Sequence, residues 1–326
     1  MEPFRYERAT DRASALATID ASPGAKFLGG GTNLVDLMRL GVERPDVLVD
    51  VTRAGDDTID DTAEGGLRIG AAVRNSDLAA DQRIRTRYPV LAEALLSGAS
   101  GQLRNLATTG GNLLQRTRCA YFQDVTKPCN KREPGTGCPA RDGDHRNLAV
   151  IGHSEHCVAT HPSDMAVALA ALDASVHAVG PSGERTIPLV DLHRLPADAP
   201  QRDTILERDE LIVAVELPAL AFAASSTYRK VRERASFSFA LVSVAAAVDV
   251  ADANIRDVRI AFGGLAHKPW RAYAAEEALR GEPANEAAFA VAADAELAHA
   301  QPLRDNAYKV QLAKATLVQT LVELLA

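Results

Sequence analysis

The sequence lacks the features by which membrane-spanning, nucleic-acid-binding and secreted proteins are usually recognised. No apolar run approaches the roughly 20 residues that span a bilayer, and Met1 to Arg5 lack the apolar stretch of a secretory signal. Basic residues are in the minority, with 36 Lys and Arg against 43 Asp and Glu, so the formal charge is −7. This mild acidic excess without a basic block argues against nucleic acid or an anionic membrane as the main partner.

The glycines fit none of the common nucleotide-binding fingerprints. There is neither a GxGxxG pattern nor a Walker loop, so neither a Rossmann nor a P-loop nucleotide site is supported. The chain has no internal repeat and no low-complexity tail. Its 326 residues, 47% of them hydrophobic, are enough for two or three packed units with a large core.

Hydrophobic periodicity predicts where these units lie. In the first unit we expect a helix over 13–19 capped by Thr10 or Asp11, a strand over 25–28, a helix over 33–40 and a strand over 46–51. A second unit begins near 65 and continues into a helical region over 76–96. Regular periodicity then disappears between 98 and 161, where prolines and glycines are frequent. It resumes with a helix over 163–172, strands over 174–179 and 210–217, and a third unit from about 225. That unit has strands over 239–248 and 255–262, then three helices.

Two short glycine motifs have the residue types of phosphate-binding loops. Gly29-Gly30-Gly31-Thr32-Asn33 follows a predicted strand and opens a predicted helix. Glycines allow backbone N–H groups to approach a phosphate closely, although a tight turn would explain the same residues. A second loop, Thr108-Thr109-Gly110-Gly111-Asn112, has hydroxyls, adjacent glycines and an amide. The pair predicts a dinucleotide bound along the junction of two units.

The segment His161-Pro162-Ser163-Asp164 starts a predicted helix. Ser163 or Asp164 is suited to cap it. Asp164 could equally accept hydrogen bonds from a hydroxyl or ring N–H of a ligand, and the sequence does not decide between these roles.

All four cysteines, Cys119, Cys129, Cys138 and Cys157, fall within 39 residues of the irregular segment. Their spacing, C-x9-C-x8-C-x18-C, lacks the close pairs of zinc fingers. Four thiolates from one loop suit an iron–sulfur cluster, for which no single spacing is required. Nearby His153 and His156 leave a mixed Cys/His zinc site open as an alternative.

The motifs at 26–34, 108–112 and 161–164 occur in the order and spacing of the FAD-binding subunits of the xanthine dehydrogenase and aldehyde oxidoreductase family, and the sequence resembles them over essentially its whole length. The third unit is similar to the C-terminal domain of carbon monoxide dehydrogenase flavoproteins. The cysteine segment resembles that of the bacterial periplasmic-type aldehyde oxidoreductase flavin subunit, which carries a four-iron four-sulfur cluster beside FAD.

The resemblance implies an α+β fold: a p-cresol methylhydroxylase-type FAD-binding fold in two subdomains, 1–57 and 58–222, plus an α/β C-terminal domain of the carbon monoxide dehydrogenase flavoprotein type, 223–326. The cysteine loop would cover about 115–160. The FAD-binding residues that it implies are Lys26, Phe27, Leu28, Gly29, Gly30, Gly31, Thr32, Asn33, Leu34, Thr108, Thr109, Gly110, Gly111, Asn112, Asp164, Ile212 and Lys230, with Ser100 and Gly101 as looser matches. The implied ligands of a 4Fe-4S cluster are Cys119, Cys129, Cys138 and Cys157.

The resemblance also implies a division of labour among subunits. A large molybdenum-cofactor subunit would hydroxylate an aldehyde, and a small subunit with two 2Fe-2S clusters would pass electrons to FAD in this chain, which reduces a terminal acceptor. The alternatives are the same role in a xanthine dehydrogenase or aromatic acyl-CoA reductase type of complex, and a non-catalytic zinc-binding scaffold. The absence of a signal predicts a cytoplasmic location, with co-export on a partner's twin-arginine signal as the alternative.

Overall fold

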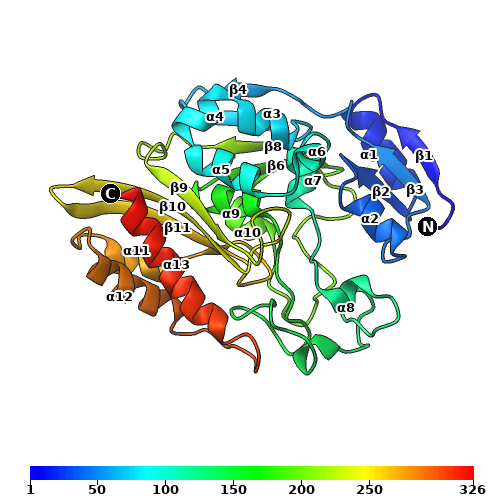
Figure 1. Cartoon of the computed structure of the whole chain (residues 1–326). Coiled ribbons are helices and arrows are strands. Elements are labelled where there is room, and N and C mark those ends of the chain that lie inside the picture. Colours follow the sequence, from blue (N-terminus) through cyan, green and yellow to red (C-terminus); the bar gives the residue numbers. More distant parts are fainter.

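The computed structural model describes residues 1–326 and divides their strands among three sheets (Figure 1). The first sheet is parallel, in the order β1-β3-β2. Its elements are β1 (Arg5–Arg8), α1 (Arg12–Ala21), β2 (Ala25–Leu28), α2 (Leu34–Arg39) and β3 (Val47–Asp50). Asp11 caps α1 by accepting a hydrogen bond from the Ser14 N–H, and α2 ends just before Gly41. The predicted helices and strands of this unit are therefore present in the predicted order, but the strand β1 was not predicted.

The second sheet is antiparallel, in the order β4-β5-β8-β6-β7. Its strands are β4 (Ile59–Asp61), β5 (Leu67–Gly70), β6 (Ser175–Gly180), β7 (Gly183–Pro188) and β8 (Leu211–Leu217). The helices associated with it are α3 (Asn75–Ala80), α4 (Gln82–Arg87), α5 (Pro89–Ser97), α9 (Asp164–Ala171) and α10 (Leu189–Leu192). The helical region predicted over 76–96 is confirmed. It is divided into three helices, because the Asp81 side chain caps a new helix and Pro89 begins another.

The third sheet is antiparallel, in the order β12-β11-β10-β9, with helices on both faces. Its elements are β9 (Ser226–Val231), β10 (Val242–Ala251), β11 (Asn254–Gly263), β12 (Trp270–Arg271), α11 (Tyr273–Leu279), α12 (Glu286–Leu297) and α13 (Tyr308–Leu324). Side chains of β10 alternate between two cores: Val244 and Ala246 pack with the C-terminal helices, and Ala245 packs with α9. The three predicted C-terminal helices are confirmed.

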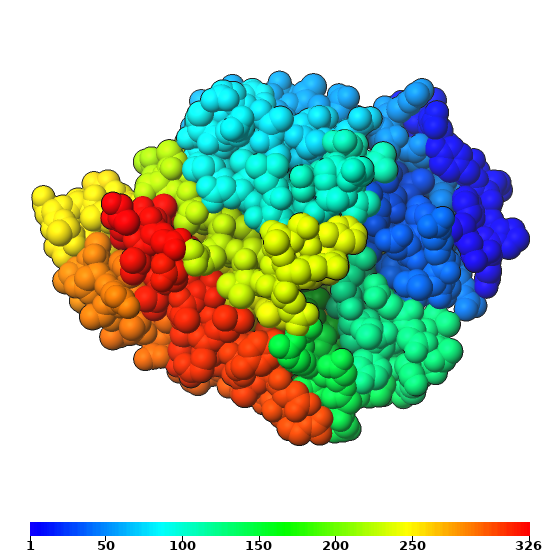
Figure 2. All heavy atoms as spheres, viewed as in Figure 1, coloured from blue at the N-terminus to red at the C-terminus, as the bar shows by residue number.

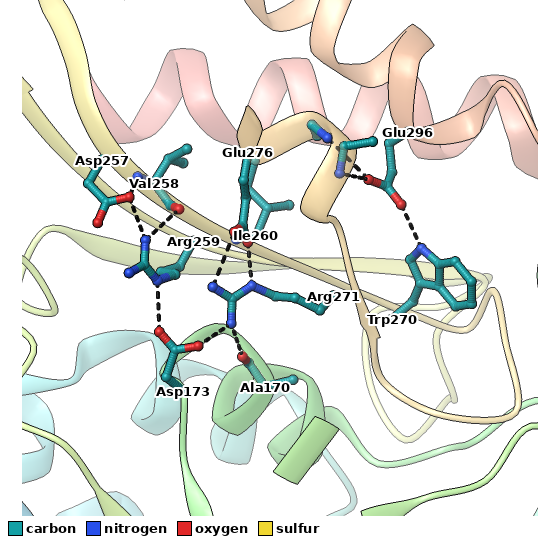
Figure 3. A network of polar contacts seen from close by, with 12 residues as sticks. Ala170, Asp173, Asp257, Val258, Arg259, Ile260, Trp270, Arg271, Glu276 and Glu296 are labelled. Atoms are coloured by element: carbon teal, nitrogen blue, oxygen red, sulfur yellow. Dashed lines mark hydrogen bonds and ion pairs between the residues drawn. The ribbon is translucent and has the colours of Figure 1, made fainter. Parts of the chain in front are cut away.

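A buried ion-pair network joins α9 to the third sheet (Figure 3). Arg271 donates to the carbonyl of Ala170 at 2.8 Å and to Asp173 at 2.5 Å, and it pairs with the buried carboxylate of Glu276. Arg259 of β11 donates to the same Asp173 at 2.7 Å. Because these charges are partly or fully withdrawn from water, each depends on its partners, and the C-terminal unit is held against the second sheet at this point.

The segment between α5 and α9 has little regular structure, as predicted. It contains only α6 (Gly101–Arg104), α7 (Thr109–Leu113), α8 (Ala120–Gln123) and one 3-10 turn, Pro139–Arg141. The segment is nevertheless packed, because Phe122, Leu148 and Val158 form a small apolar core with the cysteines and with Leu37 of α2. No helix anywhere in the structure has the length and apolarity to cross a membrane.

Candidate cofactor-binding site

The two glycine loops meet through direct backbone contact. A Cβ atom on Gly30 would lie 1.8 Å from the carbonyl oxygen of Leu106, and one on Gly29 would lie 2.7 Å from Oγ1 of Thr108. Gly31 adds a left-handed backbone at φ +73°, which a side chain disfavours. Thr108 caps α7 by accepting a hydrogen bond from the Gly111 N–H. The first loop therefore needs glycine because the second loop fills the space that a side chain would occupy.

A cavity of about 690 Å³ opens along one side of these loops. It is lined by β2, the first glycine loop, Thr108 and Ile212 of β8. Its size falls within the usual range of cofactor pockets. The predicted residues that line it are Lys26, Phe27, Leu28, Gly29, Gly30, Gly31, Thr32, Asn33, Leu34, Thr108, Gly110, Gly111 and Ile212.

A second cavity, of about 510 Å³, lies on the other side of the loop junction and shares Thr32, Asn33 and Gly111 with the first. Asn112, Asp164 and Lys230 also line it, together with the loop after β9. Figure 2 shows this yellow loop reaching across to the teal and blue segments that carry the two glycine motifs. The two cavities thus lie next to each other at the junction of the first and second units.

Asn33 has an unused hydrogen-bond donor at this junction. Its Oδ1 accepts from the Arg116 N–H at 2.9 Å, while its Nδ2 is buried and has no partner. A buried amide without a partner is costly, so a ligand with an acceptor at this point would stabilise it. The donors at this junction therefore fit a ligand that carries acceptor oxygens, such as the phosphates of a dinucleotide.

In the second cavity, Asp164 is held by two side chains from β9. Tyr228 donates to Oδ1 at 2.6 Å and Lys230 donates to Oδ2 at 2.8 Å. Burial and the neighbouring Asp164 carboxylate raise the pKa of Tyr228 well above its ordinary value. Ser163, rather than Asp164, is the helix cap, and it also donates to Oδ1 of Asn112 at 2.6 Å. Asp164 therefore does not have the capping role and lines the cavity, and its contact with a ligand stays a prediction.

Three of the predicted residues line neither cavity. Thr109 is fully buried and donates to the carbonyl of Val73 at 3.0 Å, which fixes the second loop against the strand connection below it. Ser100 caps α6, and Gly101 is exposed with no neighbouring atom within 4 Å of its Cβ position.

Sequence reasoning missed a charge network in the wall of the first cavity, which Lys26, Glu43, Arg116 and Asp203 all line. Arg116 donates to Glu43 at 2.8 Å and to Asp203 at 2.6 Å, and Lys131 of the cysteine segment pairs with the same Asp203. Lys26 of β2 pairs with Glu43. Burial opposes ionisation of Asp203, but Lys131 and Arg116 outweigh it and hold its pKa well below the ordinary value. These residues are far apart in sequence, so no local spacing reveals them.

The four cysteines converge on one enclosed pocket, although they come from four separate turns of the irregular segment. Cys119, Cys129 and Cys157 are buried, and Cys138 is partly exposed. Burial raises the pKa of Cys119 to about 11. A hydrogen bond between Cys157 and Cys138 lowers the pKa of Cys138 to about 6 and raises that of Cys157. One member of this pair is therefore readily deprotonated, which ligation of a metal requires.

No group of three or more His, Cys, Asp or Glu side chains in the structure is arranged to hold a metal ion. All ligands of one zinc ion must lie within about 2.3 Å of it, and this arrangement is absent. His153, which could complete a mixed site, bonds instead to the carbonyl of Gln301 at 2.7 Å. The geometry thus gives the zinc alternative no support. The cluster ligation also stays a prediction, since no arrangement of ligands for it is present either.

Comparison with known proteins identifies the parts of the chain. Residues 2–220 match the FAD binding domain in molybdopterin dehydrogenase, and residues 226–324 match the CO dehydrogenase flavoprotein C-terminal domain. The aldehyde oxidoreductase FAD-binding subunit PaoB of Escherichia coli K12 is 52% identical over 99% of this chain and 98% of that protein. The glyceraldehyde dehydrogenase medium chain of Sulfolobus acidocaldarius is 26% identical over 87% of this chain and 83% of that one. A solved carbon monoxide dehydrogenase from Hydrogenophaga pseudoflava matches at a TM-score of 0.77 and 26% identity, covering 99% of this chain and 98% of that chain.

Proposed function

The chain belongs to the family of FAD-binding subunits of molybdopterin dehydrogenases, and from this premise we propose that it serves a molybdenum hydroxylase that oxidises aldehydes. The family makes it the FAD-binding medium subunit of an oxidoreductase complex. The observation that carries the aldehyde assignment is the 52% identity with PaoB over nearly the full length of both chains. Xanthine and aromatic acyl-CoA complexes remain the alternative, since the large subunit selects the substrate.

The chain's own residues would bind and orient the cofactor. Bound FAD supplies exchange between one-electron and two-electron transfer. Gly29 to Gly31 line the first cavity, where their backbone N–H groups could bind its phosphates, and the free Nδ2 of Asn33 offers a further donor at the loop junction. In this proposal, the second cavity takes the flavin end. There Lys230 and Tyr228 hold the Asp164 carboxylate in a fixed position.

We further propose that the four cysteines ligate a 4Fe-4S cluster. Three observations support this: their thiols line one enclosed pocket, the segment has no second set of soft ligands, and Lys131 brings positive charge close to Cys157. Positive charge favours thiolates and an anionic cluster. The division into subdomains 1–57 and 58–222 and a C-terminal domain 223–326 also belongs to the proposal; the three sheets are consistent with it.

The proposed partners are a large molybdenum-cofactor subunit and a small subunit with two 2Fe-2S clusters. This chain would accept electrons from them and pass them through FAD to a terminal acceptor. The carbon monoxide dehydrogenase and glyceraldehyde dehydrogenase relatives are themselves medium chains by name.

The test is cofactor analysis of the complex purified from cells that express all subunits. We expect one FAD per copy of this chain, and four iron atoms beyond those of the small subunit. Cys129→Ser should remove those four while FAD is retained, because Cys129 lies outside both flavin cavities. A complex without FAD would refute the flavin assignment. Zinc in place of the extra iron would refute the cluster and support the scaffold alternative.

A further inference from the structure

One cysteine of the pocket has a histidine partner from a different part of the fold. Nε2 of His267 lies 3.1 Å from Sγ of Cys157, and both side chains are buried. His267 belongs to the connection between β11 and β12 in the C-terminal unit, 110 residues away in sequence. No sequence motif marks this residue, and neither flavin cavity includes it.

The backbone around His267 is fixed to the cysteine segment. The carbonyl of Leu265 accepts from the Val150 N–H at 2.9 Å, and the carbonyl of Ala266 accepts from the His161 N–H at 2.9 Å. These bonds lie on either side of the cysteine segment's last turn, which carries Cys157. Main-chain hydrogen bonds therefore hold the imidazole of His267 next to Cys157.

The ring has no other hydrogen bond. Its Nδ1 is buried without a partner, so the contact with Cys157 is the one polar interaction that the imidazole makes. A ligating thiolate carries no proton and can only accept a hydrogen bond. Nε2 must then be the protonated nitrogen when Cys157 is a thiolate.

We propose that His267 is a positioning residue that donates a hydrogen bond from Nε2 to the Cys157 thiolate and thereby raises the reduction potential of the cluster. This inference rests on the proposed 4Fe-4S ligation. Hydrogen bonds to the sulfurs are among the factors that set the potential of such clusters. A donor stabilises negative charge on sulfur, and the reduced cluster carries one more negative charge than the oxidised cluster. The donor therefore favours reduction.

The experiment compares three variants of the assembled complex. His267→Leu removes the donor, His267→Gln keeps an N–H donor on a side chain of similar reach, and His145→Leu is the matched control. His145 is equally buried and packs on the same segment, but it bonds to the carbonyl of Ala140 and the Asp305 N–H rather than to a cysteine. The readouts are iron per chain and the midpoint potential of the 4Fe-4S signal in an EPR-monitored redox titration.

We expect the cluster potential to fall in H267L, to lie between H267L and wild type in H267Q, and to stay at the wild-type value in H145L. The flavin potential should not change in any of them. Equal cluster potentials in H267L and wild type, at equal iron content, would overturn the proposal. If H267L does not retain iron, H267N replaces it, because the asparagine amide is too short to reach the sulfur of Cys157. A wild-type cluster potential in H267N would also overturn the proposal. Wild type without the extra iron would instead refute the cluster assignment itself.

Discussion

The flavin cavities and the cysteine pocket are built by opposite means. The first cavity depends on backbone groups from loops about 80 residues apart, which touch because Gly29 and Gly30 have no side chains. The cysteine pocket comes from one segment of 39 residues, and side chains line it. The flavin region should therefore be sensitive to added atoms. The cysteine region should be sensitive to lost partners, because its irregular backbone relies on buried ion pairs and hydrogen bonds.

The largest effect should follow from filling the space at Gly30. In Gly30→Ala, the new methyl group overlaps the carbonyl of Leu106, and the loops must separate. Overpacking typically costs about 1–3 kcal/mol, and overlap with backbone atoms places Gly30→Ala at the upper end. If the FAD-bound state bears this whole cost, the loss of FAD affinity is about a hundredfold. The loss of affinity is measured from the FAD content after purification and from titration of the apoprotein with FAD.

Gly101→Ala is the control, since its Cβ would meet no atom within 4 Å. Retained FAD in that variant would also remove Gly101 from the predicted FAD contacts. Equal FAD affinity in Gly30→Ala and Gly101→Ala would contradict this prediction, because the loop junction would then tolerate a side chain.

The next largest effect should come from removing a partner in the charge network. Asp203→Asn leaves Arg116 and Lys131 without the carboxylate that they share. Breaking a buried pair costs about 3–5 kcal/mol, but 32% of the Asp203 side chain is exposed, so we expect about 2–3 kcal/mol. Chemical denaturation of the complex-free chain measures the loss. Glu207→Gln, at an exposed pair with Arg202, should change stability by less than about 1 kcal/mol.

The difference in stability between wild type and Asp203→Asn should decrease in acid. Because the pKa of Asp203 is lowered in the folded state, its contribution is complete above the unfolded value of about 3.9 and disappears as pH falls through the folded value. The gap between wild type and Asp203→Asn should therefore stay constant above about pH 5 and shrink only in acid. A gap that widened in acid would contradict the assigned pairing.

The smallest effect concerns Lys309 of α13, which is fully buried and donates to the carbonyls of Asn147 and Leu148 in the cysteine segment, at 3.1 Å and 2.9 Å. Burial lowers its pKa to about 7. Between pH 7 and the unfolded value of about 10.4, the folded state binds fewer protons, so stability rises with pH. Relative to Lys309→Met, wild type should gain about 1 kcal/mol per pH unit above pH 7. Thermal unfolding at pH 7, 8 and 9 tests this, and a parallel pH dependence in both proteins would refute it.

Local sequence signals predicted the elements that have local causes. The cap at Asp11, the helix ending before Gly41 and the three C-terminal helices are each specified by neighbouring residues, and all are present. The helical region over 76–96 was predicted from its alanine and leucine content, but its division into three helices at Asp81 and Pro89 was not. The strand β7 escaped prediction because its side chains are almost all exposed and give no apolar alternation.

The sequence alone determined which residues could bind a cofactor. Glycine loops, an acidic helix start and clustered cysteines can be recognised from residue types and short spacings. Only the tertiary structure decided which of them share a site. It brought Asn33 to the junction of two cavities, joined Lys131 to Arg116 through Asp203, and set His267 against Cys157. The physical reason is that burial and pairing of charges depend on contacts between distant segments, which no local pattern records.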